Sequence, residues 1–325
     1  MEGKKQSTAL VVAVSLLAWM CPHALSAQGH PTLSGPRSAK VYLGRWDLTV
    51  RTPTQERPSW IEISDVDGRL EGVMIGVWGH ATPTGEIRIE GGYIELVVPT
   101  DEGFPDGTQL HGRLAGGELV GTVTTPDGAS WPWTGHRAPA LEGKAITKWG
   151  KPIRLFDGKD LAGWTFADPT QASSWSVEGG TLVKRGRGSE IVTTSRFRDF
   201  KLHVEFNCGP MANSGVYLRG RYEVQIETNA AQEPPNRRMG SIYGFIAPKP
   251  SPPRTPNVWQ SYDITLVGRT VTVVDDGRMI IDHREIPGIT GGALNTDESS
   301  PGPIYLQGAE DGRVVFRNIV ITPAE

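Results

Sequence analysis

Hydrophobic and polar residues alternate with a period of two over many short segments of this chain. In residues 42–50, for example, Trp46, Leu48 and Val50 fall on one face. Successive side chains of a strand point to opposite faces, so this alternation predicts half-buried β-strands. The same pattern recurs in SWIEI, RLEGVMIGVWG, EIRIEGGYIELVV and QLHGRLAGGELVGTV. We therefore expect a smaller antiparallel β barrel or sandwich over residues 41–137.

The alternation is lost over residues 138–151 and returns from residue 152 to residue 325. A break between two complete strand series predicts a linker between two all-β domains. The 40 Gly and 25 Pro residues of the chain agree with many short strands joined by turns. In the first domain we interpret Trp46, Trp60 and Trp78 as core or rim packing rather than a sugar platform.

The first 27 residues read as a signal peptide. Lys4 and Lys5 precede an apolar run over residues 9–20, and small residues lead up to Ala27. This order predicts cleavage after Ala27 and export to the periplasm or the extracellular space. Residues 28–40 are polar and rich in Pro, Gly and Ser, which is typical of a flexible leader.

Cysteine usage and charge narrow the class of protein further. A lipid anchor at Cys21 is the alternative to cleavage, but the bulky Trp19 and Met20 before it disfavour that reading. Cleavage after Ala27 leaves Cys208 as the only thiol, so no intramolecular disulfide is expected. The net charge of -3 and the scattered Lys and Arg residues argue against nucleic acid as a partner. The apolar run over residues 9–20 is shorter than the roughly 20 apolar residues that a membrane-spanning helix needs, and no later stretch of the sequence reaches that length.

Seven sequence blocks in the second half carry a family resemblance. They are LFDGKDLAGW, WSVEGGTLV, DFKLHVEF, NSGVYLRGRYEVQIE, GSIYG, WQSYDITLVG and GPIYLQGAEDGRVVFRNIVI. In this order they resemble the 3-keto-disaccharide hydrolase domain family, over about Lys151 to Thr322. The resemblance implies a concanavalin-like jelly-roll sandwich with a saccharide on its concave face. It also implies that the substrate is a glycoside whose glucose ring has been oxidised at C3 by a partner sugar 3-dehydrogenase.

The block from Asn213 to Glu227 carries most of the candidate chemistry. If it runs as one strand, its odd-numbered residues form one polar stripe, from Tyr217 through Arg219, Arg221, Glu223 and Gln225 to Glu227. A tyrosine, an arginine and a carboxylate on one face suit sugar hydroxyls and a carbonyl. We interpret Glu227 at the end of the stripe as a rim or structural residue.

A second ionisable row precedes this block, at Lys201, His203 and Glu205. These residues alternate with Leu202, Val204 and Phe206, as the two faces of a half-buried strand do. We interpret Lys201 and His203 of this row, together with Glu227, as the solvated face of an antiparallel sheet.

A ketone at C3 acidifies the proton on C2, so one base suffices to form an enolate and expel the group on C1. Addition of water then completes a net hydrolysis, whereas stopping at elimination makes the protein a lyase. For this chemistry we assign Glu223 as base, Arg219 as oxyanion stabiliser, and Tyr243 or Lys249 as acid for the leaving group. The expected substrate-binding residues are Asn213, Tyr217, Arg221, Gln225, Trp164, Tyr305, Gln307 and Asp311. Burial under Trp164 or Tyr305 is expected to raise the pKa of Glu223.

One departure from the family pattern leaves alternatives open. Family members commonly carry a His after the LQ of the penultimate strand, whereas LQGAEDG here carries Glu310 and Asp311. This puts the hydrolase outcome in question, and a non-catalytic carbohydrate-binding module with an N-terminal partner-docking domain is the alternative function. No cofactor and no metal is expected. The alternative is a Ca²⁺ ion bound by Asp297, Glu298, Glu310 and Asp311.

Overall fold

The computed structural model describes residues 39–76, 79–100, 103–227, 233–308 and 312–325. Contacts divide the chain into Met1–Thr32 and Leu33–Glu325, and every described residue belongs to the second unit. The expected signal peptide, Cys21 and residues 28–38 of the expected leader lie outside the described residues. In the part of the chain that is described, no helix has the length and apolar character to cross a membrane.

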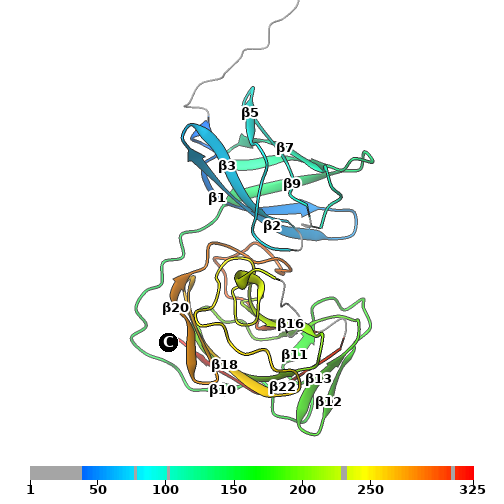
Figure 1. Cartoon of the computed structure of the whole chain (residues 1–325), viewed down its shortest axis with the longest axis vertical. Coiled ribbons are helices and arrows are strands. Elements are labelled where there is room, and N and C mark those ends of the chain that lie inside the picture. The colour runs from blue at the N-terminus through cyan, green and yellow to red at the C-terminus, as the bar shows by residue number, and fades with distance from the viewer. Residues whose placement is uncertain (1–38, 77–78, 101–102, 228–232, 309–311) are drawn as a thin grey trace, which may run out of the picture. The chain divides into compact units, whose positions relative to one another are not determined.

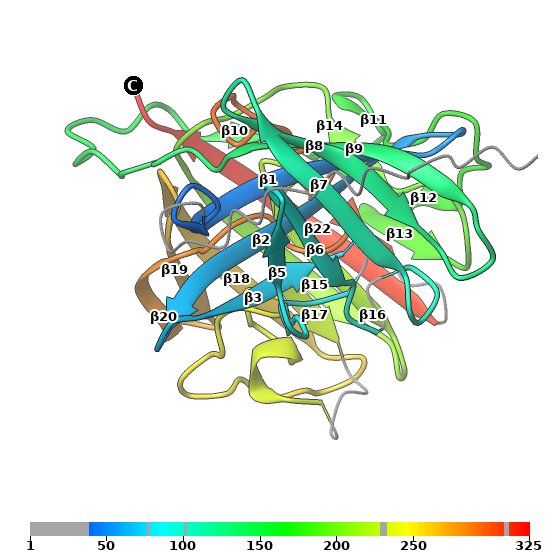
Figure 2. The same ribbon diagram turned by 90° about the horizontal axis from the view of Figure 1, so that it is seen from above.

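The first nine strands form one antiparallel sheet. They are β1 (Gly44–Arg51), β2 (Glu56–Val66), β3 (Arg69–Ile75), β4 (Thr82–Pro83), β5 (Arg88–Glu90), β6 (Tyr93–Val97), β7 (Gln109–Ala115), β8 (Glu118–Thr124) and β9 (Ser130–Arg137). The order is β4-β3-β2-β1-β9-β8-β7-β6-β5, so the first and last strands pair while β4 and β5 form the edges. The sheet has its own apolar cluster, which includes Trp46 and Trp133. Figure 2 shows its strands β1, β2, β3, β7, β8 and β9 from above.

The remaining strands form two further antiparallel sheets (Figure 1). The larger has the order β12-β13-β22-β15-β18-β19-β20, with β10 beside β22, and the smaller has the order β11-β14-β21-β16-β17. Their bounds are β10 (Ile153–Arg154), β11 (Trp164–Phe166), β12 (Trp175–Glu178), β13 (Thr181–Arg185), β14 (Ile191–Thr193), β15 (Phe200–Cys208), β16 (Asn213–Leu218), β17 (Tyr222–Glu227), β18 (Trp259–Val267), β19 (Thr270–Asp275), β20 (Arg278–Glu285), β21 (Tyr305–Gln307) and β22 (Arg313–Pro323). A 3-10 turn, η1 (Pro235–Arg237), follows β17.

The two C-terminal sheets share one apolar core. Leu202, Val204 and Phe206 of β15 join Val216 and Val224 of the smaller sheet in a single buried cluster. Burial of alternate strand residues between two sheets is what stabilises a β sandwich. The expected all-β fold, a jelly-roll sandwich preceded by a smaller antiparallel β domain, is confirmed.

Residues 138–151 contain no strand, as expected of a linker, although Trp149 makes an isolated bridge to Ala324. The boundaries of two separately folding domains stay a prediction. Trp46 and Trp60 are buried, whereas Trp78 lies outside the described residues. Cys208 is a buried free thiol in the sandwich core.

Candidate functional site

The block expected to be one strand is a hairpin. β16 ends at Leu218 and β17 begins at Tyr222, with Arg219 and Gly220 between them at φ of 54° and 67°. Positive φ values at consecutive residues turn the chain back on itself. The expectation of a continuous stripe through Gly220 is therefore wrong, and Arg219 lies in the turn rather than on the strand face.

The concave face of the smaller sheet carries two rows of side chains that run across the strands. Tyr305 pairs with Tyr217, and Tyr217 pairs with Glu223. In the neighbouring row Gln307 pairs with Gly215, and Gly215 pairs with Gln225. Tertiary structure thus brings together the predicted residues of β16, β17 and β21, which are Asn213, Tyr217, Glu223, Gln225, Tyr305 and Gln307.

Glu223 is a buried carboxyl group on this face, 3% exposed. Burial raises its pKa to about 8, against the opposing effect of the hydrogen bond from Tyr217. Its Oε2 lies 3.0 Å from the Tyr217 hydroxyl, which also lies 2.8 Å from Gly291 O. The Tyr217 ring stacks on Tyr305 with centroids 4.4 Å apart. The expected burial of Glu223 therefore comes from the tyrosine layer.

Gly215 makes room for the Glu223 carboxyl group. A Cβ at position 215 would lie 2.2 Å from Glu223 Oε1, so any side chain there would displace the carboxyl. The amide of Gln225 is best satisfied with its nitrogen 3.1 Å from the same Oε1 and 2.8 Å from Ser214 O. Because Gly215 has no side chain, the carboxyl lies next to Gln307 across one strand spacing.

Gln307 presents a buried acceptor without a partner. Its Oε1 is shielded and accepts no hydrogen bond from any described residue. A buried polar atom that lacks a partner costs free energy, and a ligand hydroxyl is one group that removes this cost. Gln307 lines the cavity that adjoins this face, and its acceptor is a polar group that the described residues leave unsatisfied there.

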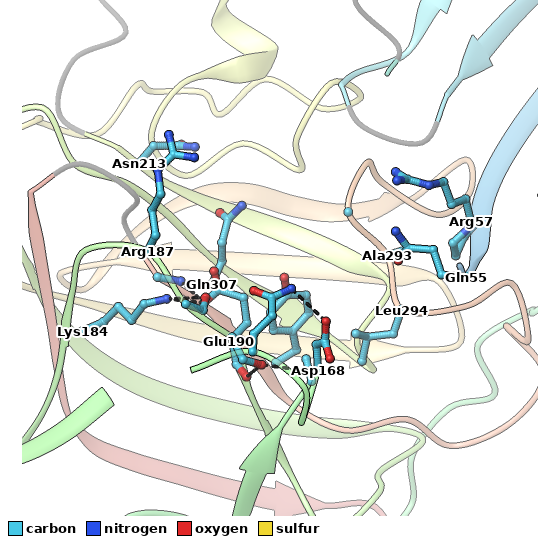
Figure 3. Close-up of a pocket in the computed structure, with 18 of the residues that line it drawn as sticks. Gln55, Arg57, Asp168, Lys184, Arg187, Glu190, Asn213, Ala293, Leu294 and Gln307 are labelled. Carbon is cyan, nitrogen blue, oxygen red and sulfur yellow. Dashed lines mark hydrogen bonds and ion pairs between the residues drawn. The ribbon is translucent and has the colours of Figure 1, made fainter. Parts of the chain in front are cut away.

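A cavity of about 740 Å³ adjoins this face (Figure 3). Three predicted residues line it: Asn213, Tyr305 and Gln307. Pockets of roughly 300–1,000 Å³ are typical of small-molecule sites. The other residues of its wall are Gln55, Glu56, Arg57, Pro58, Ala167, Asp168, Gln171, Lys184, Arg187, Gly188, Ser189, Glu190, Met211, Gly292, Ala293, Leu294 and Gly308.

An ion pair in this wall was missed by the sequence reasoning. Lys184 is 1% exposed, and its Nζ lies 3.3 Å from Glu190 Oε2 and 3.1 Å from Gly188 O. Gly308 N also donates to Glu190. The one available signal was a polar Lys184 that ends the apolar run TLV in β13, and such a residue is most often exposed. Burial beside the cavity makes this cation a candidate for holding a developing negative charge.

The two arginines predicted at the site are occupied elsewhere. Arg219 donates to Arg198 O, to Asp199 Oδ1 at 2.9 Å and to Gly268 O at 2.8 Å. Because its guanidinium is bonded at the turn end of the hairpin, the structure does not bring it to Glu223.

Arg221 has a similar structural environment. It donates to Asn295 Oδ1 at 2.9 Å and to Ser300 O at 3.0 Å, which ties the turn to the segment before β21. Burial lowers the pKa of both Arg219 and Arg221. Neither residue lines the cavity.

Three other predicted residues lie in different surroundings. Trp164 packs in the sandwich core and donates to Leu155 O at 2.7 Å, so it does not cover Glu223. Lys249 is exposed, and its backbone binds Ile280 O rather than the cavity. Tyr243 is half-buried, and its backbone N–H donates to Glu223 O at 3.1 Å. Of the two proposed acids, Tyr243 is the one that lies beside Glu223.

Glu227 is buried rather than at a solvent-exposed rim. It is 3% exposed, and its Oε1 accepts from Met239 N at 3.1 Å and lies 3.6 Å from Arg254 Nη1. Its contacts hold the segment that follows β17. The structural role expected of Glu227 agrees with this position, but the expected exposure was wrong.

The acidic residues considered for Ca²⁺ divide into two sets. Asp311 and Glu310 lie outside the described residues. Glu298 is buried and accepts from the Tyr222 hydroxyl at 2.7 Å and from Arg269 at 3.1 Å, while Asp297 accepts from Ser299. Within the described ranges, no three His, Cys, Asp or Glu side chains gather as a metal site. Calcium binding stays a prediction.

The fold and the site define an all-β sandwich with a polar cavity against its concave sheet. Residues 151–322 match the model of the 3-keto-alpha-glucoside-1,2-lyase-like domain, and the chain belongs to this family of carbohydrate-processing domains. The resemblance to 3-keto-disaccharide hydrolases is thereby confirmed.

Three relatives illustrate the range of similarity. A 3-keto-disaccharide hydrolase of Bacteroides thetaiotaomicron is 28% identical over 75 residues, which make up 20% of this chain and 26% of that protein. The match thus spans about a quarter of this curated relative. A presumed glycosyl hydrolase of Parabacteroides distasonis is 30% identical with a TM-score of 0.46, covering 55% of this chain and 92% of its own. A carbohydrate-binding module of Bacillus subtilis is 18% identical with a TM-score of 0.34, covering 48% and 93%.

Proposed function

We propose that this protein is an exported enzyme that processes 3-keto-glycosides. The observation that carries the proposal is the Glu223 carboxyl group, which is buried over Gly215, the register partner of the unpartnered Gln307. A base that removes a carbon-bound proton works best when its pKa is near the working pH, and the Glu223 pKa is raised to about 8. Family membership supports a substrate that carries a ketone at C3.

In the proposed reaction the sugar ring lies over Gly215, with one hydroxyl donating to Gln307 Oε1. Ionised Glu223 takes the proton from C2, and the electron pair of the C–H bond forms an enolate on the C3 oxygen. Lys184, the buried cation of the cavity wall, stabilises that negative charge. This role replaces the one first assigned to Arg219.

The enolate then collapses to a C1–C2 double bond, and the C1–O bond breaks. The leaving oxygen takes a proton from Tyr243 or from the newly protonated Glu223, which releases an alcohol. Water adds at C1 and a proton returns to C2, which gives net hydrolysis. If the reaction stops before water addition, the product is an enone and the protein is a lyase. An upstream sugar 3-dehydrogenase is the class of enzyme that supplies the ketone.

The test compares oxidised and unoxidised forms of one substrate. The purified chain is incubated with trehalose, lactose and their 3-keto forms, and ketosugar release and enone absorbance are followed. We expect turnover of the 3-keto forms alone. Ordinary glycoside hydrolysis needs two carboxyl groups that act on the bond, and the second carboxyl group of this face, Glu190, is held by Lys184 and by Gly308 N. Equal rates on both forms contradict the ketone-dependent mechanism. Binding of these sugars without any turnover identifies a binding module instead.

A further inference from the structure

The N-terminal sheet contributes to the wall of the cavity. The β1–β2 tip, defined as residues 55–58, supplies Gln55, Glu56, Arg57 and Pro58 to the lining. In Figure 3, Gln55 and Arg57 lie across the cavity from Lys184 and Arg187. The tip takes no part in the proposed reaction, so it lines the cavity for another reason.

The tip has a fixed local geometry. Thr52 N donates to Gln55 O at 3.0 Å, and Gln55 N donates to the Thr52 hydroxyl at 3.2 Å. Just beyond this turn, Arg57 pairs with Val50 and Arg51 with Glu56 across the two strands. Turns closed by such local hydrogen bonds have a defined conformation. The tip is therefore a part of the cavity wall that has a defined conformation.

The sheet that carries the tip is itself anchored to the sandwich. Trp60 of β2 is 1% exposed and belongs to the apolar cluster of the sandwich core. It meets Phe245 edge-on at 5.3 Å, and a Cβ at Gly288 would lie 2.2 Å from its Nε1. The same sheet also contacts the sandwich through Arg45, whose Nη1 lies 3.0 Å from Glu285 Oε1. Burying a tryptophan in this way stabilises the contact strongly, so the tip cannot move away without exposing Trp60.

The segment between the N-terminal sheet and Glu223 is packed on both sides. A Cβ at Gly291 would lie 2.2 Å from Gly79 O, while a Cβ at Gly292 would lie 2.7 Å from the Tyr217 hydroxyl. Gly291 O also accepts from that hydroxyl at 2.8 Å. The connection between β3 and β4 therefore packs against the backbone that contacts the Tyr217–Glu223 pair.

The dimensions of the concave face exceed one sugar ring. If the β14–β21 register is extended by one residue, Glu190 lies opposite Gln307. From Glu190 to Gln225 the row then crosses three strand spacings, or roughly 14 Å. A hexose that reacts over Gly215 covers only part of this row, and the cavity beside the row is also lined by Leu294 and by the tip. The amide of Gln55 and the guanidinium of Arg57 are donors suited to hydroxyl groups.

We propose that the β1–β2 tip recognises the leaving-group sugar of the substrate. The inference rests on the proposed function, since it names the part of that same site that holds the leaving group. The N-terminal sheet is then a specificity element of the enzyme. Gln55 and Arg57 act on substrate affinity, and the chemical step stays with the concave sheet.

The test uses two substrates that share one reacting ring. The full chain and its Gln55→Ala/Arg57→Ala double variant are assayed with 3-keto-trehalose and with methyl 3-keto-α-glucoside. We expect the ratio of kcat/KM for the disaccharide over the methyl glycoside to fall at least tenfold in the double variant, through KM. Arg88→Ala, at an exposed residue of the same sheet that pairs with Glu86, is the matched control and leaves the ratio unchanged. A ratio that stays within twofold in the double variant overturns the proposal.

A binding measurement separates this inference from the proposed function. Calorimetric titration with unoxidised trehalose and methyl α-glucoside gives the same preference without any chemistry. If the wild type turns over neither keto substrate, the proposed function fails, and the titration alone decides. If the wild type prefers trehalose tenfold or more and the double variant loses this preference, recognition by the tip is supported. A wild type without that preference, or a double variant that keeps it, refutes the inference.

Discussion

The outer face of the eight-stranded sheet and the concave face of the five-stranded sheet both carry alternating ionisable residues. On the outer face, His203 lies 2.7 Å from Asp263, and Glu205 lies 2.6 Å from both Arg317 and Asn318. Burial alone would raise the pKa of Glu205, but hydrogen bonds from Asn318 and Arg317 outweigh it, and the pKa is lowered. Each acid there has partners and access to water.

On the concave face the balance is reversed. Glu223 is 3% exposed, burial dominates its environment, and its pKa is raised to about 8. The same two-residue alternation therefore produces a solvated row of ionisable residues on one sheet and a buried carboxyl group with a raised pKa on the other. The difference lies in what covers each face rather than in the strand sequence.

The largest expected effect is on kcat, and it is tested by substituting one acidic residue on each face. Glu223→Gln keeps the shape of the side chain but deletes the base, so kcat on a 3-keto-disaccharide should fall by roughly 10² to 10⁴ with little change in KM. Glu205→Gln, its control on the outer face, should leave kcat within about twofold. Steady-state kinetics measure both. An active Glu223→Gln variant together with an inactive Asp311→Asn variant means that the base lies elsewhere.

The pH dependence of the wild type tests the raised pKa directly. The base works in its ionised form, and at pH values below about 8 most of Glu223 is protonated. We expect kcat/KM to rise about tenfold per pH unit from pH 6 and to level off near pH 8. Initial rates in overlapping buffers give the profile. A profile that is flat between pH 5 and pH 9 contradicts a base with this pKa.

A smaller effect is expected for Glu227, which is buried near Glu223 but has partners. In Glu227→Gln the amide oxygen still accepts from Met239 N, and only the charge facing Arg254 is lost. The free energy of unfolding should fall by about 1–2 kcal/mol, while kcat changes by less than about tenfold. Urea unfolding and kinetics on the same preparation separate the two effects. A loss of turnover as large as in Glu223→Gln would move the catalytic centre along the strand.

The smallest effect is expected on the outer face. The His203–Asp263 pair has side chains 36% and 54% exposed, and such surface pairs contribute about 0.2–1 kcal/mol. Asp263→Asn should therefore lower the free energy of unfolding by less than about 1 kcal/mol and leave turnover unchanged. Denaturation at low and high salt measures the change, which salt should reduce further. A drop in activity here would show that the outer face takes part in function.

Much of the fold follows from the sequence alone. Period-two alternation specifies strands, since each strand buries one face, and glycine-rich breaks specify where strands end. The identity of the family also follows from local blocks, which residues 151–322 match as a unit. Glu223 and Gln225 share one face as predicted, because alternation within β17 determines it, whereas Tyr217 joins them through the register of the β16–β17 hairpin.

The rest of the candidate site depended on tertiary structure. Arg219 reads as part of the stripe, but the positive φ of a turn directs it to Asp199 and backbone carbonyls instead. Lys184 is six residues from its partner Glu190, but its burial depends on the distant Gly308, whose missing side chain leaves room for it. Alternation along a strand fixes which side chains share a face, whereas burial, pairing and the chemistry that follows depend on segments distant in sequence.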